Sequence, residues 1–194
     1  AVQRLLEGNL VIVPTETVYG IGADATNTKA IKKIFHIKKR PFNNPIICHF
    51  ENLEKVNEHV KLNGTALKMA KTFWPGPLTL ILKKRKNSKI SPYVSNNNDM
   101  IGCRVPNHPI ALKILQILNR PIAAPSANLT TKLSSTNIEH MDDKLKKNVF
   151  IINGGSCDFG LESTVVNVNS ETPKILRYGS ITEEEIKNII SEID

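Results

Sequence analysis

The chain has 194 residues, of which 40% are hydrophobic and 23% are charged, and its formal net charge is +8. This composition is typical of a folded domain and argues against disorder along the whole length, and no apolar run approaches the ~20 residues that span a bilayer. The positive charge favours anionic partners, either nucleic acid or a nucleotide such as ATP, although a solvated lysine-rich surface would give the same total.

Apolar periodicity and capping residues predict strands and helices that alternate irregularly along the chain. The expected elements are, in chain order, a helix over 1–7, a strand over 10–13, a helix capped by Thr28 and ended by Pro41, a strand over 45–50, a helix over 66–73, strands over 78–82 and 101–105, a helix over 108–118, strands over 149–153, 163–168 and 174–176, and a helix capped by Thr182. Residues 83–98 are polar and predict an exposed loop. Without repeats or a linker, the pattern indicates one α/β domain with a mixed sheet.

Three cysteines, Cys48, Cys103 and Cys157, lie far apart in the sequence and form no CxxC pair. An odd and sparse set argues against a disulfide framework and against a zinc site. We therefore expect small buried thiols in a reducing compartment.

Several polar clusters fall at the ends of predicted strands, where α/β proteins place ligand sites. Residues 14–22 combine two threonines with two glycines but match neither a Walker loop nor a dinucleotide fingerprint. Lys38 and Arg40 lie at the end of a predicted helix, where they either complement the helix dipole or clamp an anion. Asn44 follows in a loop held by two prolines. His49 lies on the next predicted strand, and a single strand histidine is usually structural.

Further candidates come later in the chain, and each of them also has an ordinary structural explanation. They are Arg104, Ser126, Asn128, Ser134, Glu162, Ser163 and Arg177. The combined set supplies cations, hydroxyls and amides without an evident pair of nucleophile and base. Such a set favours positioning and charge stabilisation of anionic reactants, as in phosphoryl or nucleotidyl transfer, over covalent catalysis. The residues alone do not name the substrates.

Seven segments of the chain carry a resemblance to a known family. In order they are PTETVYG, KKRPFNNPIICH, FWPGPLTL, GCRVPNHP, PSAN, ESTVV and ILRYGSIT. With these segments the chain resembles the YrdC-like threonylcarbamoyl-AMP synthases over nearly its whole length. The resemblance implies a single YrdC-like domain over residues 1–194, with a twisted mixed sheet, flanking helices and a large basic concave face.

The resemblance also implies two groups of site residues. The implied ATP site comprises Lys38, Arg40, Asn44, Ser126, Asn128, Ser134 and Arg177, with Lys38 and Arg40 as catalytic residues. The implied L-threonine site comprises Thr17, His49, Arg104 and Ser163. No side chain is expected to ligate a metal, and Mg²⁺ is expected to enter with ATP.

The implied reaction makes threonylcarbamoyl-AMP and pyrophosphate from L-threonine, bicarbonate and ATP. The product would pass to a separate threonylcarbamoyl transferase that modifies adenosine in tRNA, and the basic face leaves room for tRNA itself. We expect a cytoplasmic protein without a membrane span. The first residue is not Met, so a removed targeting segment stays open. Longer family members carry a second domain, and the chain is expected to be a short form or an excised domain.

Three alternatives stay open at this point. The first is a module that binds double-stranded RNA or tRNA without catalysis, although only 5% of the residues are aromatic and could stack on bases. The second is an enzyme of similar fold acting on sugar phosphates, such as a dihydroxybutanone phosphate synthase, which would need acidic metal ligands. The third is a carbamoyl-transfer domain of a larger maturation protein.

Overall fold

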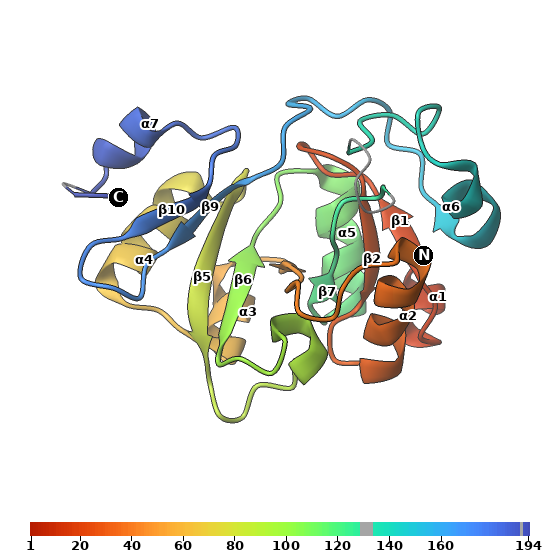
Figure 1. Ribbon diagram of the computed structural model, residues 1–194, viewed down its shortest axis with the longest axis horizontal. Coiled ribbons are helices and arrows are strands. Elements are labelled where there is room, and N and C mark those ends of the chain that lie inside the picture. Colours follow the sequence, from red (N-terminus) through yellow and green to blue (C-terminus); the bar gives the residue numbers. More distant parts are fainter. Residues whose placement is uncertain (129–133, 191) are drawn as a thin grey trace.

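The computed structural model describes residues 1–128, 134–190 and 192–194, and within them ten strands form one mixed sheet with helices on its sides (Figure 1). The strands are β1 (Val11–Val13), β2 (Gly20–Asp24), β3 (Cys48–His49), β4 (Val60–Lys61), β5 (Leu78–Lys84), β6 (Met100–Arg104), β7 (Ile122–Ala123), β8 (Phe150–Ile151), β9 (Thr164–Asn167) and β10 (Lys174–Arg177). The helices are α1 (Val2–Leu6), α2 (Thr28–Lys38), α3 (Leu53–His59), α4 (Gly64–Phe73), the 3-10 turn η1 (Pro92–Ser95), α5 (Pro109–Leu118), α6 (Asp143–Asn148) and α7 (Glu183–Lys187). The predicted mixed-sheet α/β architecture is confirmed.

The strand order brings distant parts of the chain together. Across the sheet the order is β10-β9-β5-β6-β3-β7-β2-β1-β8, and β4 pairs with the far end of β5. The pairs β5–β9, β3–β6 and β1–β8 are parallel, and the remaining pairs are antiparallel. In the β5–β9 pair Leu78 lies opposite Thr164, so the last quarter of the chain docks beside a strand from its first half.

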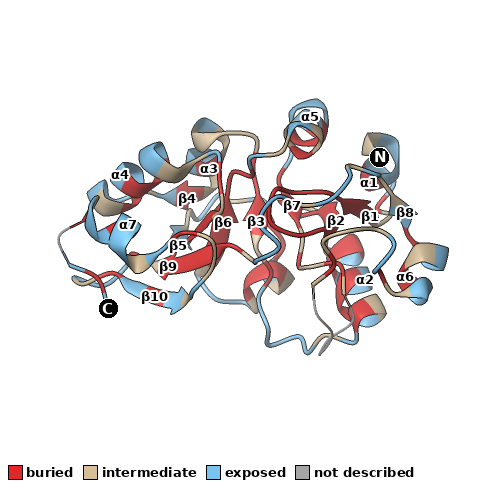
Figure 2. Cartoon of the chain, turned by 90° about the horizontal axis from the view of Figure 1, so that it is seen from above, coloured by how far each residue is buried: buried red, intermediate tan, exposed pale blue. Residues whose placement is uncertain are grey.

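Two apolar clusters are separated by the sheet, as the alternation of side chains in a strand requires. On β1, Val11 and Val13 face α1 and α5, whereas Ile12 belongs to the larger cluster on the other side. Figure 2 shows the same division, with buried strands in the middle and helices α5 and α2 on opposite sides of them. The described helices include none that is long and apolar enough to cross a membrane.

Helix ends agree with the predicted capping signals in one case and differ in another. Thr182 caps α7 in a full capping box: its hydroxyl accepts from the Glu185 N–H, and the Glu185 carboxylate accepts from the Thr182 N–H. At α2 the predicted cap was wrong by one residue: Asn27 caps the helix by accepting from the Ala30 N–H. The same helix ends at Lys38, before Pro41, because Lys39 takes a left-handed conformation with φ of 50°.

The polar segment 83–98 is only partly the exposed loop that we expected. Strand β5 continues to Lys84, and η1 begins at Pro92. Ile90 and Val94 are buried and join the main core, where Val94 accepts a hydrogen bond from the Ile46 backbone. These two apolar side chains fix the segment against the core, although its polar composition predicted an exposed loop.

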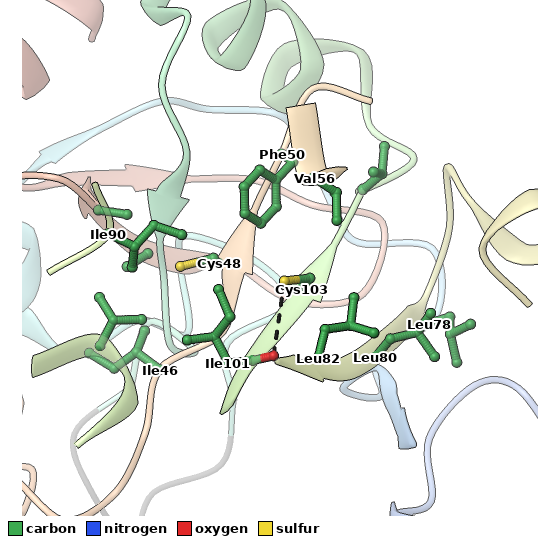
Figure 3. Close-up of a cluster of buried hydrophobic side chains, with 14 of the residues drawn as sticks. Ile46, Cys48, Phe50, Val56, Leu78, Leu80, Leu82, Ile90, Ile101 and Cys103 are labelled. Carbon is green, nitrogen blue, oxygen red and sulfur yellow. Dashed lines mark hydrogen bonds between the residues drawn. The ribbon is translucent and has the colours of Figure 1, made fainter. Parts of the chain in front are cut away.

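Figure 3 shows Cys48 and Cys103 within the apolar cluster between β3, β5 and β6. All three cysteines are free thiols, and Cys48 and Cys103 are fully buried, as predicted, whereas Cys157 is only half-buried. Burial raises the pKa of Cys48 to about 12, so its thiol stays protonated and unreactive.

Candidate functional site

A cavity of about 370 Å³ lies where the predicted polar clusters converge. Eight of the eleven predicted site residues line it, and they come from six separate segments of the chain. They are Thr17, Arg40, Asn44, His49, Arg104, Ser126, Ser163 and Arg177. The remaining three each hydrogen-bond a lining residue: Lys38 and Asn128 bond Ser126, and Ser134 bonds Glu162. Residues that the sequence separates widely therefore form one site.

The lining divides into two halves by burial. The buried half consists of Thr17, His49, Arg104 and Ser163, each at most 8% exposed. The open half consists of Arg40, Asn44, Ser126 and Arg177, all partly or largely exposed. Because a small ligand can be desolvated completely and a large polyanion cannot, the two halves suit ligands of different size.

Arg104 is fixed at the end of β6 by two hydrogen bonds. Its Nη2 donates to Oε1 of Glu16 at 2.6 Å, and its Nε donates to the Gly76 carbonyl at 3.2 Å. Arg104 is 4% exposed and Glu16 is 2% exposed. A buried carboxylate therefore neutralises the guanidinium, while its Nη1 makes no hydrogen bond with the described residues and the side chain faces the cavity.

His49 on β3 lies opposite Arg104 on β6, because the two strands pair in parallel with these residues in register. Burial, together with the neighbouring charge of Arg104, lowers the pKa of His49 to about 3. The imidazole is therefore neutral at physiological pH, and it is not a general acid there. The imidazole lines the cavity, while its Nδ1 is buried and makes no hydrogen bond with the described residues.

Two hydroxyl groups complete the buried half. Thr17 Oγ1 lies 3.0 Å from Thr15 Oγ1, and Thr15 in turn donates to the Val18 carbonyl. Ser163 Oγ lies 2.7 Å from Thr79 Oγ1 and accepts a hydrogen bond from Arg177 at 3.1 Å. Ser163 thus contacts the arginine of the open half, and it joins the two halves.

Arg40 is held in the open half by the loop that follows it. Its Nη2 donates to Asn44 Oδ1 at 2.7 Å and to the Pro45 carbonyl at 2.8 Å, and its Nε donates to the Asn44 carbonyl. Asn44 therefore orients Arg40, which is a role that spacing alone did not assign. No carboxylate is paired with Arg40 among the described ion pairs, so its charge remains available to an anion.

Lys38 forms hydrogen bonds with the loop 126–128. Its Nζ donates to the Ser126 carbonyl at 2.5 Å and also to the carbonyl and side-chain oxygens of Asn128. Burial, followed by the charge of Arg40, lowers the pKa of Lys38 to about 8. This contact between Lys38 and the Ser126–Asn128 segment was not predicted from the sequence, and the ammonium group holds that loop from outside the cavity lining.

Glu162 also lines the open half. It was named as a candidate from the sequence but was assigned to neither the ATP site nor the threonine site. Its Oε1 accepts from Ser134 at 2.9 Å, and its Oε2 is paired with Arg177. Burial would raise the pKa of Glu162, but Arg177, the hydroxyls of Ser134 and Ser126 and the charge of Lys38 outweigh it and lower the pKa. The carboxylate is therefore ionised and surrounded by donors.

Glu16 was likewise outside the assigned residues. It lies between two threonines in the PTETVYG segment, and this position was the only sequence signal that could have marked it as a site residue. Its partner Arg104 lies 88 residues further along the chain, so only the fold reveals the pair.

Gly179 lets the chain just after β10 lie close to Glu162 and Ser163, which precede β9. A Cβ at this position would lie 2.2 Å from the Glu162 carbonyl and 2.5 Å from the Thr164 nitrogen. We expect Gly179→Ala to lower the free energy of unfolding by about 1–3 kcal/mol or more, because backbone atoms cannot move aside as a flexible side chain would. Thermal denaturation of the purified protein measures the change.

The matched control is Gly64→Ala, because a Cβ there meets no atom within 4 Å at the start of α4. We expect it to be neutral or slightly stabilising. Equal melting temperatures for the Gly179 and Gly64 variants would contradict the close approach of Gly179 to Glu162 and Ser163.

Metal-binding side chains are sparse in the described ranges, which contain no group of three or more His, Cys, Asp or Glu side chains able to hold an ion. Glu162 is the one acidic side chain among the residues that line the cavity, and it is paired with Arg177. The described residues therefore do not form a cage for a resident Mg²⁺, which prefers six oxygen ligands.

Comparison with known proteins identifies the family of the chain. The family model Sua5_yciO_yrdC, described as "Telomere recombination", matches residues 3–179. The chain is 45% identical to the threonylcarbamoyl-AMP synthase of Pyrococcus abyssi over 96% of its length and 55% of the relative, so it spans about half of that protein. It is 31% identical to the threonylcarbamoyl-AMP synthase of Vibrio parahaemolyticus, covering 90% of this chain and 95% of the relative.

A solved structure gives the same result. The crystal structure of P. abyssi Sua5 complexed with L-threonine superposes with a TM-score of 0.95 at 41% identity, covering all of this chain and 57% of that one. Both the sequence match and the superposition extend over the segments that form the cavity. The chain therefore belongs to the Sua5/YciO/YrdC family.

Proposed function

We propose that this chain is an L-threonylcarbamoyladenylate synthase that uses L-threonine, bicarbonate and ATP. The observation that carries the proposal is the meeting of two differently built halves in one cavity. The buried half offers Arg104, the neutral His49 and two hydroxyls to a small zwitterion, and the open half offers Arg40 and Arg177 to a polyphosphate. The names of the relatives, threonylcarbamoyl-AMP synthases, support the same substrates.

In the buried half, Nη1 of Arg104 is the group that would hold the threonine carboxylate. Glu16 keeps this guanidinium in place, so the carboxylate and the amine of the substrate would have a fixed orientation. The hydroxyl of Thr17 or Ser163 would recognise the substrate hydroxyl. The ammonium group of the zwitterion first releases a proton to solvent. The nitrogen of the neutral amine then forms a bond to the carbon of bicarbonate, and the bicarbonate hydroxyl leaves with a second nitrogen proton as water.

The carbamate formed in this step is unstable in water, so a site that excludes solvent protects it. A carbamate oxygen then forms a bond to the α-phosphorus of ATP while the bond to the β-phosphate oxygen breaks. Pyrophosphate leaves with the negative charge. Arg40 and Arg177 would stabilise this charge as it develops, and Mg²⁺ would enter as part of the MgATP substrate.

The direct test is pyrophosphate release from ATP, Mg²⁺ and bicarbonate by the purified chain, with and without L-threonine. We expect release only when both threonine and bicarbonate are present, with L-serine a much poorer substrate. Binding of tRNA at low salt without any release of pyrophosphate would instead favour the RNA-binding alternative. Release that needs carbamoyl phosphate would favour the carbamoyl-transfer alternative.

The affinity for ATP is expected to depend on pH through Lys38. Because the pKa of Lys38 is about 8, its ammonium loses its charge between pH 7 and pH 10, and the loop 126–128 loses a charged donor. We expect the dissociation constant of ATP to rise ~10-fold over this range. Calorimetric titration with MgATP at several pH values measures it, because bound Mg²⁺ keeps the γ-phosphate deprotonated throughout this range.

Lys38→Arg is the control for this pH effect, because arginine stays charged throughout the range. Its ATP affinity, whatever its absolute value, is expected to be flat between pH 7 and pH 10. A flat profile for the unmodified protein would remove Lys38 from this role.

We propose further that the product passes to a threonylcarbamoyl transferase acting on tRNA in the cytoplasm.

A further inference from the structure

The open half of the cavity already contains an anion, the Glu162 carboxylate. It receives hydrogen bonds from Ser134 and Arg177, and Lys38 and Ser126 lie close enough to lower its pKa. These four partners belong to the set that the resemblance assigns to ATP, and all four are hydrogen-bond donors of the kind that phosphates accept from. A phosphate and the carboxylate therefore need the same donors.

The two acid–arginine pairs of the site differ in how easily they can separate. The Glu16–Arg104 pair is almost fully buried, at 2% and 4% exposure, and separating it would leave a bare charge away from water. The Glu162–Arg177 pair is 33% and 37% exposed, so water can solvate either partner when the pair opens. Glu16 is thus a permanent counter-ion, whereas Glu162 is placed where an incoming anion can replace it.

We propose that Glu162 is an exchangeable counter-ion that occupies the anion-binding donors of the open half and is displaced when the polyphosphate of a nucleotide binds. The inference rests on the proposed function, because it takes ATP as the ligand of the open half. Arg177 keeps its bonds to the Ser163 carbonyl and hydroxyl during this exchange, so the guanidinium stays in position while its acidic partner leaves. The carboxylate thereby holds the cationic groups in place before ATP arrives, at a cost in ATP affinity.

The test compares the unmodified chain with Glu162→Gln in binding of ATP, AMP, adenosine and inorganic pyrophosphate, measured by calorimetry. Removing the competing charge is expected to tighten ATP and pyrophosphate binding about tenfold, AMP less, and adenosine not at all. Weaker binding of ATP and pyrophosphate by Glu162→Gln would overturn the proposal, because the carboxylate would then assist binding. Failure of the unmodified chain to bind ATP would count against the proposed function instead.

Glu58→Gln is the matched control. Glu58 is an exposed acid on α3 that pairs with Lys55 at 2.9 Å and is absent from the cavity lining. The variant makes the same change in net charge, so it reports any gain from the overall field of the protein. An equal gain in both variants would show a general charge effect and overturn the specific exchange.

A measurement on the unmodified chain answers the question even where Glu162→Gln folds poorly. The ¹⁵N–¹H resonances of the Arg177 guanidinium, assigned from their loss in Arg177→Lys, are expected to shift at the Nη1 that pairs with Glu162 as inorganic pyrophosphate is added. The corresponding resonance of Arg104, held by Glu16, is expected to stay in place. Binding of pyrophosphate without a shift at Arg177 would contradict the displacement of Glu162.

Discussion

Replacing Arg104 by alanine is expected to raise the L-threonine concentration needed for half-maximal pyrophosphate release by ~10–100-fold, with little change in the ATP requirement. The reason is that a charged hydrogen bond to a carboxylate contributes ~1.5–3 kcal/mol. Arg104 lies in the buried half, whereas Arg40 and Arg177 lie in the open half. Steady-state kinetics with each substrate varied in turn measures the two requirements. An equal rise in both would exclude a threonine-specific role.

This variant also leaves Glu16 buried without its partner, which typically costs ~3–5 kcal/mol of stability. The double variant Arg104→Met with Glu16→Gln removes both charges and separates the two effects. We expect its melting temperature to recover towards that of the unmodified chain while the threonine requirement stays high. Recovery of normal threonine use in the double variant would show that Arg104 acts only through stability.

Arg40→Ala is expected to reduce the rate of pyrophosphate release ~100–1000-fold, because removing one donor from a developing negative charge has effects of this size. Its stability should fall by only ~1 kcal/mol, since Arg40 bonds neutral oxygens in a partly exposed loop. Rapid-quench measurement with saturating substrates gives the rate, and thermal denaturation gives the stability.

Two comparisons define what Arg40 does. Arg40→Lys keeps the charge but loses the planar fork, and we expect an intermediate rate. Asn44→Ala removes the side-chain oxygen that orients Arg40, and we expect a smaller loss than that of Arg40→Ala. Near-normal release by Arg40→Ala would refute the assignment of Arg40 to catalysis.

Local signals were sufficient to predict most of the longer elements. The apolar spacing of 108–118 and the Thr182 cap led to helices that match α5 and α7, and the run 78–82 lies within β5. Short elements were not predicted, because β2 begins at Gly20 in a segment for which no strand was expected, and α3 lies in a stretch with only Val56 fully buried. Tertiary pairing, not local preference, decides such segments.

The site shows the same limit more clearly. Lys38, Arg40, Ser126 and Arg177 were selected through the resemblance, and they do meet around one cavity. Which residue pairs with which was not predictable, because the pairs Glu16–Arg104 and Glu162–Arg177 depend on strand order and register. A sequence shows that cations are present, but only the fold shows which of them are already neutralised.

The parallel pairing of β5 with β9 has a consequence for the kinetics of folding. Leu78 meets Thr164 only after a long intervening segment has closed, and non-local parallel pairs of this kind form slowly. Ser163, Glu162 and Arg177 are positioned by β9 and β10, whereas Arg40 follows α2 near the beginning of the chain. During synthesis the nascent chain therefore has no complete anion site until its last quarter has left the ribosome. A ligand of that site would contact residues from both the first and the last parts of the chain, and its binding would stabilise their association only after both have folded.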